Sequence, residues 1–485
     1  MDFEKDFLMT ESHAEQLPTV RIKQIIIENF KSVKYGEILL DCGKQFVPCG
    51  TKSDILGIYG QNGSGKTALI EALSILKNLM AGAGVPSAYA DCVAIDAEYS
   101  HLCFTFDLQY PSGEIRELEY SFKLNKVKLS DEEKEERYKH APEDFPIPET
   151  AYRVHIFDEI LKLSCKGNNV KMTKQLFVDT STDNTPFGPA NKLKLFVNNN
   201  KDTILSLMVN KKLTAEKSRS FIFNKKTLQI FKDSSLYSIY FQVLLEMRYF
   251  ASLYFYVIDT KSTGIIRLNF AQPIYTRSAP LHFPVNDPLT FSEEDYNDVN
   301  SIFEKLSNVL SQIVPGLKIG LKKLGEKITP DGEKGCSVEL VSYRNDIELP
   351  LRDESDGVRK IISTLALFVA AYNDQSFTLA IDEFDAGVFE YLLGELLQLF
   401  EKSGKGQFIF TSHNLRPLEV INRKFLVFTT TNPENRYYRL KGIGKTNNLR
   451  DTYFREIILG EQDEQIYNKT KQYKIEAALQ KARDF

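Results

Sequence analysis

The residues best suited to chemistry form a glycine-rich loop between an apolar strand and a helix. Residues 60–67 read Gly-Gln-Asn-Gly-Ser-Gly-Lys-Thr and match the pattern GxxxxGK[ST] in full. Glycines let the backbone curl so that its N–H groups face phosphate oxygens, and the following helix adds partial positive charge. We expect Lys66 to contact the β and γ phosphates and Thr67 to bind Mg²⁺. The loop therefore predicts a site for ATP and Mg²⁺.

A pair of acids follows a second apolar strand. Residues 378–381 read Thr-Leu-Ala-Ile and end at Asp382 and Glu383. Asp382 is placed to complete the Mg²⁺ shell, and Glu383 is placed to polarise an attacking water. Two acids at a strand end are common, so the pair gains meaning only from the phosphate loop in the same chain. Together they predict hydrolysis of the nucleotide as well as binding.

Two further segments complete the pattern. His413 lies in Thr-Ser-His-Asn just past a strand, from where it can reach a γ-phosphate. Residues 354–360, Glu-Ser-Asp-Gly-Val-Arg-Lys, directly precede a helix, so the Ser355 hydroxyl and the backbone at Gly357 would form an anion site. Taken alone, the histidine fits a core polar residue and the second segment fits a helix cap. Beside the loop and the acids, both are expected to meet the γ-phosphate.

Elements of alternating type must position these residues. Helices and strands alternate at short spacing around the acids: helix 358–373, strand 377–381, helix 388–402 and strand 407–410. This order indicates a parallel sheet with crossover helices. Antiparallel elements are expected elsewhere: a hairpin over 97–124, an amphipathic helix over 296–313, and two or three strands over 317–350. Ser130 and Glu133 are expected to cap a short surface helix.

The chain of 485 residues is long enough for two to four structural units at roughly 100–200 residues each. We expect an α/β fold divided into 1–125, with the phosphate loop, an inserted α+β region over 126–315, a second half of the same unit over 316–435, and a helical tail over 436–485. The insert has the weakest sequence patterns of the chain, and we expect it to determine the specificity of interaction with other molecules.

Charge and cysteine usage limit the partners. The chain has 61 basic and 65 acidic residues, so a nucleic-acid contact would have to be a local patch. One candidate is a basic run between 211 and 226 interleaved with Phe221 and Phe223; a solvated face over a core strand is the favoured alternative. The six cysteines form no CxxC pair and are expected to be buried, without zinc. No stretch resembles a membrane span or a signal peptide, so a cytoplasmic protein is expected.

In this order, the motifs resemble the ABC-class ATPase heads of the SMC, RecF and OLD group. Residues 28–32, Glu-Asn-Phe-Lys-Ser, resemble the N-terminal strand motif of that group. The phosphate loop corresponds to Walker A, Ser355–Gly357 to the signature, Asp382–Glu383 to Walker B, Asp385 to the D-loop and His413 to the switch histidine. The signature departs from the family text, because Glu354 replaces an apolar residue and Val358 follows the glycine. The implied nucleotide-binding residues are Gly60, Asn62, Gly63, Ser64, Gly65, Lys66, Thr67, Ser355, Gly357 and Asp385. Gln109 is the candidate for the Q-loop.

The resemblance implies a mechanism and a type of partner. Two heads of this group sandwich two ATP molecules, with Walker A of one head and the signature of the other on the same γ-phosphate, so a homo-oligomer is expected. The chain lacks the long heptads and the CxxC hook of SMC and break-repair ATPases, and the segment after His413 is too short for an OLD-type nuclease. The compact form resembles the ATPase subunits of bacterial anti-phage systems such as Septu, PARIS and ATPase-bearing retrons. In those systems a separate effector, usually a nuclease, carries the toxic activity.

Two alternatives stay open at the level of sequence. A RecF-like DNA-binding ATPase of repair or replication would share the same motifs and would bind nucleic acid in a salt-dependent way. A transporter ATPase subunit is disfavoured by the large insert between the motif halves and by the loose signature.

Overall fold

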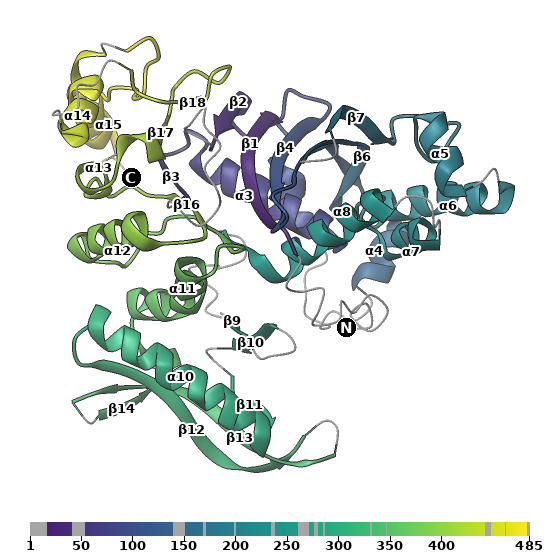
Figure 1. Cartoon of the computed structure of the whole chain (residues 1–485). Helices are drawn as coiled ribbons and strands as arrows, with labels where there is room; N and C mark the ends of the chain where they lie inside the picture. Colours follow the sequence, from purple (N-terminus) through teal and green to yellow (C-terminus); the bar gives the residue numbers. More distant parts are fainter. Residues whose placement is uncertain are drawn as a thin grey trace.

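The computed structural model describes most of the chain. The described residues are 17–40, 54–138, 151–167, 171–197, 200–233, 238–259, 271–275, 280–284, 287–329, 332–345, 347–441, 448–460 and 462–482. Within them, two six-stranded sheets lie side by side, and a smaller four-stranded sheet forms a separate lobe below α11 (Figure 1). The fold is thus α/β, with one mixed sheet and further antiparallel sheets.

The mixed sheet carries the phosphate loop. Its strands, in spatial order, are β18 (Tyr437–Tyr438), β17 (Leu426–Thr429), β3 (Asp54–Tyr59), β16 (Gln407–Thr411), β15 (Thr378–Ile381) and β8 (Phe255–Ile258). All except β18 run parallel, as predicted from the alternating elements. The carboxyl ends of parallel strands meet at one edge, where ligands bind in open α/β sheets.

Helices cover one face of this sheet and a second sheet lies beyond the other. α11 (Asp356–Asn373), α12 (Glu390–Ser403), α13 (Pro417–Val420) and α14 (Leu449–Leu459) flank one face. Their core includes Phe368, Leu397, Leu418 and Tyr453. α3 (Lys66–Met80) packs on the opposite face, and its buried side chains join those of the antiparallel sheet in one core. The phosphate-loop helix is therefore held between two sheets.

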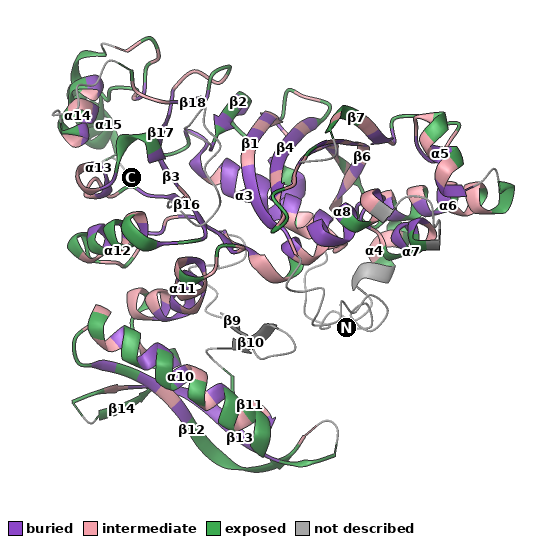
Figure 2. Ribbon diagram, viewed as in Figure 1, coloured by how far each residue is buried: buried purple, intermediate pink, exposed green. Residues whose placement is uncertain are grey.

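The antiparallel sheet has the order β2 (Val33–Leu39), β1 (Thr19–Phe30), β4 (Ser100–Gln109), β5 (Ile115–Lys128), β6 (Tyr152–Lys166) and β7 (Lys171–Asp179). β4 and β5 form the predicted hairpin, and alternate residues such as Phe104 and Phe122 are fully buried on one face. Figure 2 shows the buried residues following these strands toward α3.

The expected boundary between 125 and 126 is wrong, because it falls inside β5. β6 and β7 continue the sheet of β1, and β8 joins the mixed sheet. All three strands therefore lie within the unit that holds the phosphate loop. The charged stretch that suggested a break begins as the end of a strand and continues as α4 (Asp131–Tyr138). The predicted cap is present: the Glu133 N–H donates to Ser130 Oγ at 3.2 Å, and the Ser130 N–H donates to Glu133 at 2.8 Å.

Helices form the rest of the expected insert. α5 (Ala190–Val197), α6 (Lys201–Glu216) and α7 (Lys225–Asp233) lie at the right of Figure 1, and α8 (Ser238–Tyr249) leads back toward the centre of the molecule. A π-helical turn, Phe250–Tyr254, then leads into β8. The short strands β9 (Ala271–Tyr275) and β10 (Pro280–Pro284) pair with each other.

The small lobe confirms two predictions. α10 (Glu293–Ile313) covers the sheet β11 (Leu289–Ser292), β13 (Lys334–Arg344), β12 (Leu317–Ile328) and β14 (Ile347–Pro350). Phe303 and Leu310 of α10 share a core with Val338 of β13 and with Ile362 of α11. The lobe is therefore packed onto α11, the helix that Ser355 caps.

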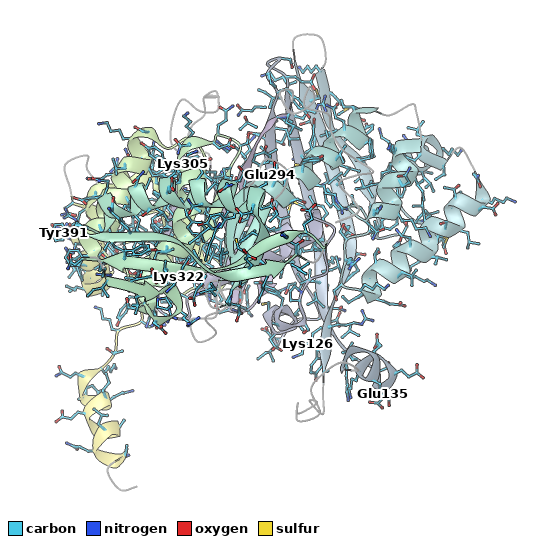
Figure 3. All side chains as sticks on the ribbon, turned by 90° about the horizontal axis from the view of Figure 1, so that it is seen from below. Lys126, Glu135, Glu294, Lys305, Lys322 and Tyr391 are labelled. Carbon is cyan, nitrogen blue, oxygen red and sulfur yellow. The ribbon has the colours of Figure 1, made fainter. Side chains whose placement is uncertain are left out.

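The C-terminal residues include a helix that contacts little. α15 (Gln472–Lys481) has no buried residue and projects away from the rest of the chain in Figure 3, where it is yellow. The expected tail over 436–485 also includes β18, which belongs to the mixed sheet. Among the described helices, none is long and apolar enough to cross a membrane.

Candidate nucleotide site

The phosphate loop connects β3 to α3 through backbone conformations that require glycine. Gly60 has φ of +153°, and a Cβ built there would lie 1.8 Å from Thr429 Oγ1. Gly65, with φ of +97°, is the left-handed residue from which α3 begins. Any other residue at these two positions would be strained or would clash. The loop is therefore fixed with its N–H groups at the N-terminus of α3.

The Lys66 side chain folds back onto the backbone of the phosphate loop. Its Nζ donates to the carbonyl oxygens of Gly60 at 2.8 Å and Gln61 at 3.1 Å. Burial lowers the pKa of Lys66, while the charges of Asp382, Glu383 and Asp385 oppose that shift. The ammonium group thus faces the acids that follow β15, and a phosphate could take over its carbonyl contacts.

Asp382 lies directly after β15 and is almost fully buried. Its Oδ1 accepts a hydrogen bond from Thr411 Oγ1 at 2.5 Å, and its carboxylate also interacts with the Thr67 hydroxyl. Burial raises the pKa of Asp382. Its Oδ2 has no hydrogen-bond partner among the described residues. An orphaned carboxylate oxygen beside a threonine hydroxyl fits the oxygen ligands that Mg²⁺ prefers.

Glu383 adopts an unusual backbone conformation. Its φ is +49°, which a non-glycine residue adopts at a cost of about 1–3 kcal/mol. Two contacts hold it there: its N–H donates to Thr411 Oγ1 at 2.7 Å, and its carbonyl oxygen accepts from Lys360 Nζ. Such strain tends to persist at sites where the side chain must be aimed. Here it accompanies a carboxylate that lines the same cleft as Lys66.

Asp385 links two loops: the acid loop, residues 382–387 after β15, and the switch loop, residues 412–415 after β16. Its Oδ2 accepts hydrogen bonds from the backbone N–H groups of His413 at 3.0 Å and Asn414 at 2.8 Å. The His413 side chain remains exposed. One carboxylate therefore sets the position of the histidine relative to Glu383.

A cleft of about 800 Å³ unites most of the residues singled out in the sequence. The expected site residues that line it are Asn62, Gly63, Gly65, Lys66, Thr67, Glu383, Asp385 and His413. Gly60 and Ser64 shape the loop instead, since Ser64 Oγ donates to the Gln61 carbonyl at 2.5 Å. Asp382 lies behind Thr67. The structure thus brings the loop, the acids and the histidine together.

Ser355 and Gly357 do not line this cleft. Ser355 is the N-cap of α11, and its Oγ accepts from the Val358 N–H at 3.4 Å. Within one chain Ser355 therefore acts as a helix cap, which is the alternative interpretation of residues 354–360. Gly357 instead lies against Gly387, two residues beyond Asp385.

The other wall of the cleft was largely missed in the sequence. Lys31, which forms an ion pair with buried Glu71, and Ser32, which donates to the Gly63 carbonyl at 3.1 Å, both line it. Asp91, near the end of the short helix Ser87–Cys92, and residues 93–95 after it also line this wall. The motif at 28–32 was a usable signal for the first pair. The 91–95 loop has no periodicity, so nothing in the sequence marks it.

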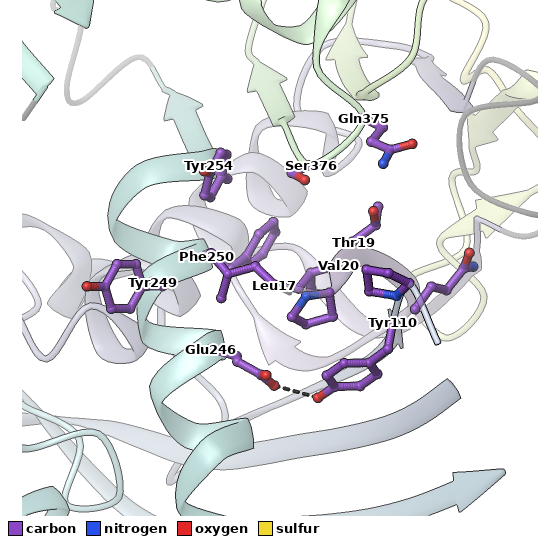
Figure 4. A pocket seen from close by; sticks show the side chains of 13 residues that line it. Leu17, Thr19, Val20, Tyr110, Glu246, Tyr249, Phe250, Tyr254, Gln375 and Ser376 are labelled. Carbon is purple, nitrogen blue, oxygen red and sulfur yellow. Dashed lines mark hydrogen bonds between the residues drawn. The ribbon is translucent and has the colours of Figure 1, made fainter. Parts of the chain in front are cut away.

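Two sequence expectations are wrong. Phe221 and Phe223 are buried and cannot stack on bases, and Lys211 Nζ donates to the carbonyls of Thr180 and Thr182. The basic run therefore lies on α6, on the start of α7 and on the segment between them, whereas a core strand was expected there. Gln109 lies outside the nucleotide cleft, in a separate cavity with Tyr110 and Glu246 (Figure 4).

Several solved structures resemble this chain at low sequence identity. An SMC head bound to the C-winged helix domain of ScpA is 13% identical, with 87% of this chain and 98% of that chain covered and a TM-score of 0.39. The SMC head domain from Thermotoga maritima is 13% identical over 87% and 100%, with a TM-score of 0.32. The recombination mediator RecF with ATP is 13% identical over 82% and 94%, with a TM-score of 0.32. A comparison with curated proteins gave no match.

The sequence itself provides the assignment. Residues 21–416 match the family model described as an AAA ATPase domain. The match begins in β1 and ends just after His413, so it spans the phosphate loop, both acids and the switch loop. The chain belongs to the family of AAA ATPase domains.

Proposed function

We propose that the chain is an ATP-hydrolysing head of the SMC/RecF type. The observation that carries this proposal is the convergence of Lys66, Glu383 and His413 on one cleft. In it, loop N–H groups and Lys66 bind the β and γ phosphates, and Glu383 accepts a proton from the attacking water. His413 donates to the γ-phosphate, held in place through its backbone by Asp385.

Mg²⁺ belongs to this reaction. Thr67 and Asp382 would hold the ion, which neutralises phosphate charge when bound. The remaining protein groups do separate work. Thr411 fixes the Asp382 carboxylate and the Glu383 N–H with one hydroxyl group, so both acids share a single support.

A second copy of the chain completes each site. Ser355 and Gly357 lie outside the cleft of their own chain, yet they stand at the N-terminus of α11, where helix N–H groups and partial positive charge favour an anion. A head-to-tail pair would place them against the γ-phosphate of the other copy. ATP then bridges two heads and hydrolysis releases them, so the nucleotide selects the paired state.

The biological role rests on the family resemblance. We infer that the ATP-paired head is a sensor and scaffold that controls a separate effector, such as a nuclease, in bacterial anti-phage defence. The compact form of the chain supports this role over that of an SMC protein. A RecF-like role on DNA is the alternative, although the buried Phe221 and Phe223 remove its first candidate contact.

One purification tests the role. The Glu383→Gln protein, tagged and purified with ATP from cells that carry its genomic neighbours, is analysed by native mass spectrometry. The defence role predicts a discrete complex with a second, neighbour-encoded protein, which Lys66→Ala loses. A bare pair whose ATP hydrolysis is stimulated by DNA in a salt-dependent way would instead support the RecF-like role.

A further inference from the structure

An exposed aromatic side chain stands immediately after the acid loop. Phe389 is 69% exposed, and its ring stacks on that of Tyr391, also exposed, with centroids 5.9 Å apart. Figure 3 labels Tyr391 at the edge of the molecule. Phe389 also occupies the N-cap position of α12, where its side chain makes no capping hydrogen bond. Serine, threonine, aspartate or asparagine at this position is worth about 1 kcal/mol. This position therefore lacks both a cover for its ring and an acceptor for the first N–H groups of the helix.

A cavity on the same functional face has the complementary features. It measures about 390 Å³ and lies between the phosphate loop, the switch loop and α14. Tyr59, Tyr453 and Tyr467 line it, and Asn62 and His413 line both this cavity and the nucleotide cleft. Tyr59 is 1% exposed, so it presents little surface to the cavity. The cavity thus offers aromatic walls beside the phosphate loop.

The C-terminal strap, defined as residues 462–468, builds one wall of this cavity. The Thr431 N–H donates to the Gln465 carbonyl at 2.7 Å, and Ile466 is buried. The Asn468 N–H then donates to Gln61 Oε1 at 3.0 Å, so the strap is fastened to the phosphate loop itself. These contacts hold Tyr467 at the cavity.

We propose that Phe389 of a second copy of this chain enters the cavity when ATP joins two heads. The inference rests on the head-to-tail pair of the proposed function and names a contact within it. Gly387 touches Gly357, so Phe389 lies beside the segment that meets the phosphate loop of the other copy. The cavity is bordered by that same loop. A two-fold pair makes the contact twice, because each copy carries one ring and one cavity.

The chemistry of the contact accounts for both deficits. Entry of the ring removes a large exposed aromatic surface from water, and aromatic anchors in pockets commonly dominate an interface. The hydroxyl group of half-buried Tyr467 can accept a hydrogen bond from the first N–H groups of α12, which the Phe389 side chain leaves uncapped. The strap also connects the contact to the phosphate loop. Gln61 of that loop accepts the hydrogen bond from the Asn468 N–H and also lines the cavity.

Cross-linking tests the proximity directly. Phe389→Cys combined with Ile457→Cys, a residue that lines the cavity, is prepared in the Glu383→Gln protein and treated with a short bismaleimide. We expect a covalent pair of chains with ATP and Mg²⁺ and none with ADP. The matched control replaces Ile458, the exposed next residue of α14, and should not cross-link.

A second variant measures the energy of the contact. Phe389→Ala should bind ATP as the parent does but weaken ATP-dependent pairing at least about tenfold, the scale of an interface hot spot. Leu399→Ala, an exposed apolar residue of the same helix, is the control and should leave pairing unchanged. If Glu383→Gln stays single with bound ATP, the proposed function fails. If pairs form but neither the cross-link nor the Phe389→Ala effect is seen, the inference alone is overturned.

Discussion

The backbone of Gly357, in the first turn of α11, lies directly against the backbone of Gly387, just past the catalytic acids. A Cβ built on Gly357 would lie 2.6 Å from the Gly387 carbonyl oxygen, and one built on Gly387 would lie 2.5 Å from Gly357 Cα. No side chain can fit between these two segments. The segment that begins α11 and the loop after β15 are therefore in direct backbone contact.

Filling this contact should impair the protein locally. Gly357→Ala is expected to lower the free energy of unfolding by about 1–3 kcal/mol, because backbone atoms cannot move away from the new methyl group as a flexible side chain could. Urea unfolding measures the change. Gly325→Ala, on a strand with open space around the added carbon, should be nearly neutral. Equal stability of the two variants would show that the two segments are not tightly joined.

Glu383→Gln should retain ATP and lose hydrolysis. The amide keeps the size of the side chain but cannot take a proton from water, so the rate should fall about 10²–10⁴-fold. Phosphate release measures hydrolysis, and a fluorescent ATP analogue measures binding. Glu390→Gln, an exposed residue in the first turn of α12, serves as the control. A Glu383→Gln protein that turns over ATP at the parental rate would assign the base to another group.

Ser355→Arg should block pairing of heads without blocking ATP binding. A long side chain at this position would occupy the space in which the other copy holds its γ-phosphate. The substitution also removes a helix cap worth about 1 kcal/mol. Ser292→Arg provides the matched control, since Ser292 caps α10 with a hydrogen bond from the Asp295 N–H at 3.1 Å. Analytical ultracentrifugation with ATP should show loss of pairs only for Ser355→Arg; pairs in both variants would refute the role of the signature.

Glu246 should make stability depend on pH. Burial raises the pKa of this carboxyl to about 7, against the effect of the Tyr110 hydroxyl group that donates to it at 2.5 Å. Because the folded chain holds this proton up to higher pH than the unfolded chain does, the free energy of unfolding should fall as pH rises from about 4.5 to about 7. Glu246→Gln should gain on the parent by on the order of 2–3 kcal/mol across this window. Urea unfolding at pH 5 and pH 8 measures it; a constant difference between the two proteins would contradict the assignment.

The sequence specifies the parts of the fold whose patterns are local. The strand–loop–helix around Lys66 and the alternation in the β4–β5 hairpin follow from spacing and apolar periodicity alone. The insert boundary failed because β5 continues through charged residues, where one face of the strand meets solvent. The wall at residues 91–95 and the strap at 462–468 could not be predicted. The first depends on backbone hydrogen bonds with Asn29 and Lys31 and the second on a hydrogen bond with Gln61, and such contacts between distant residues leave no periodic signal.

The central claim is that ATP joins two copies of this chain through the cleft that Lys66 and Glu383 line. Light scattering on the Glu383→Gln protein with saturating ATP and Mg²⁺ tests it most directly. The account predicts twice the 55.5 kDa mass of one chain with ATP, and the single-chain mass with ADP or in the Lys66→Ala, Glu383→Gln double variant. A protein that binds ATP yet keeps one mass under all of these conditions would contradict the account.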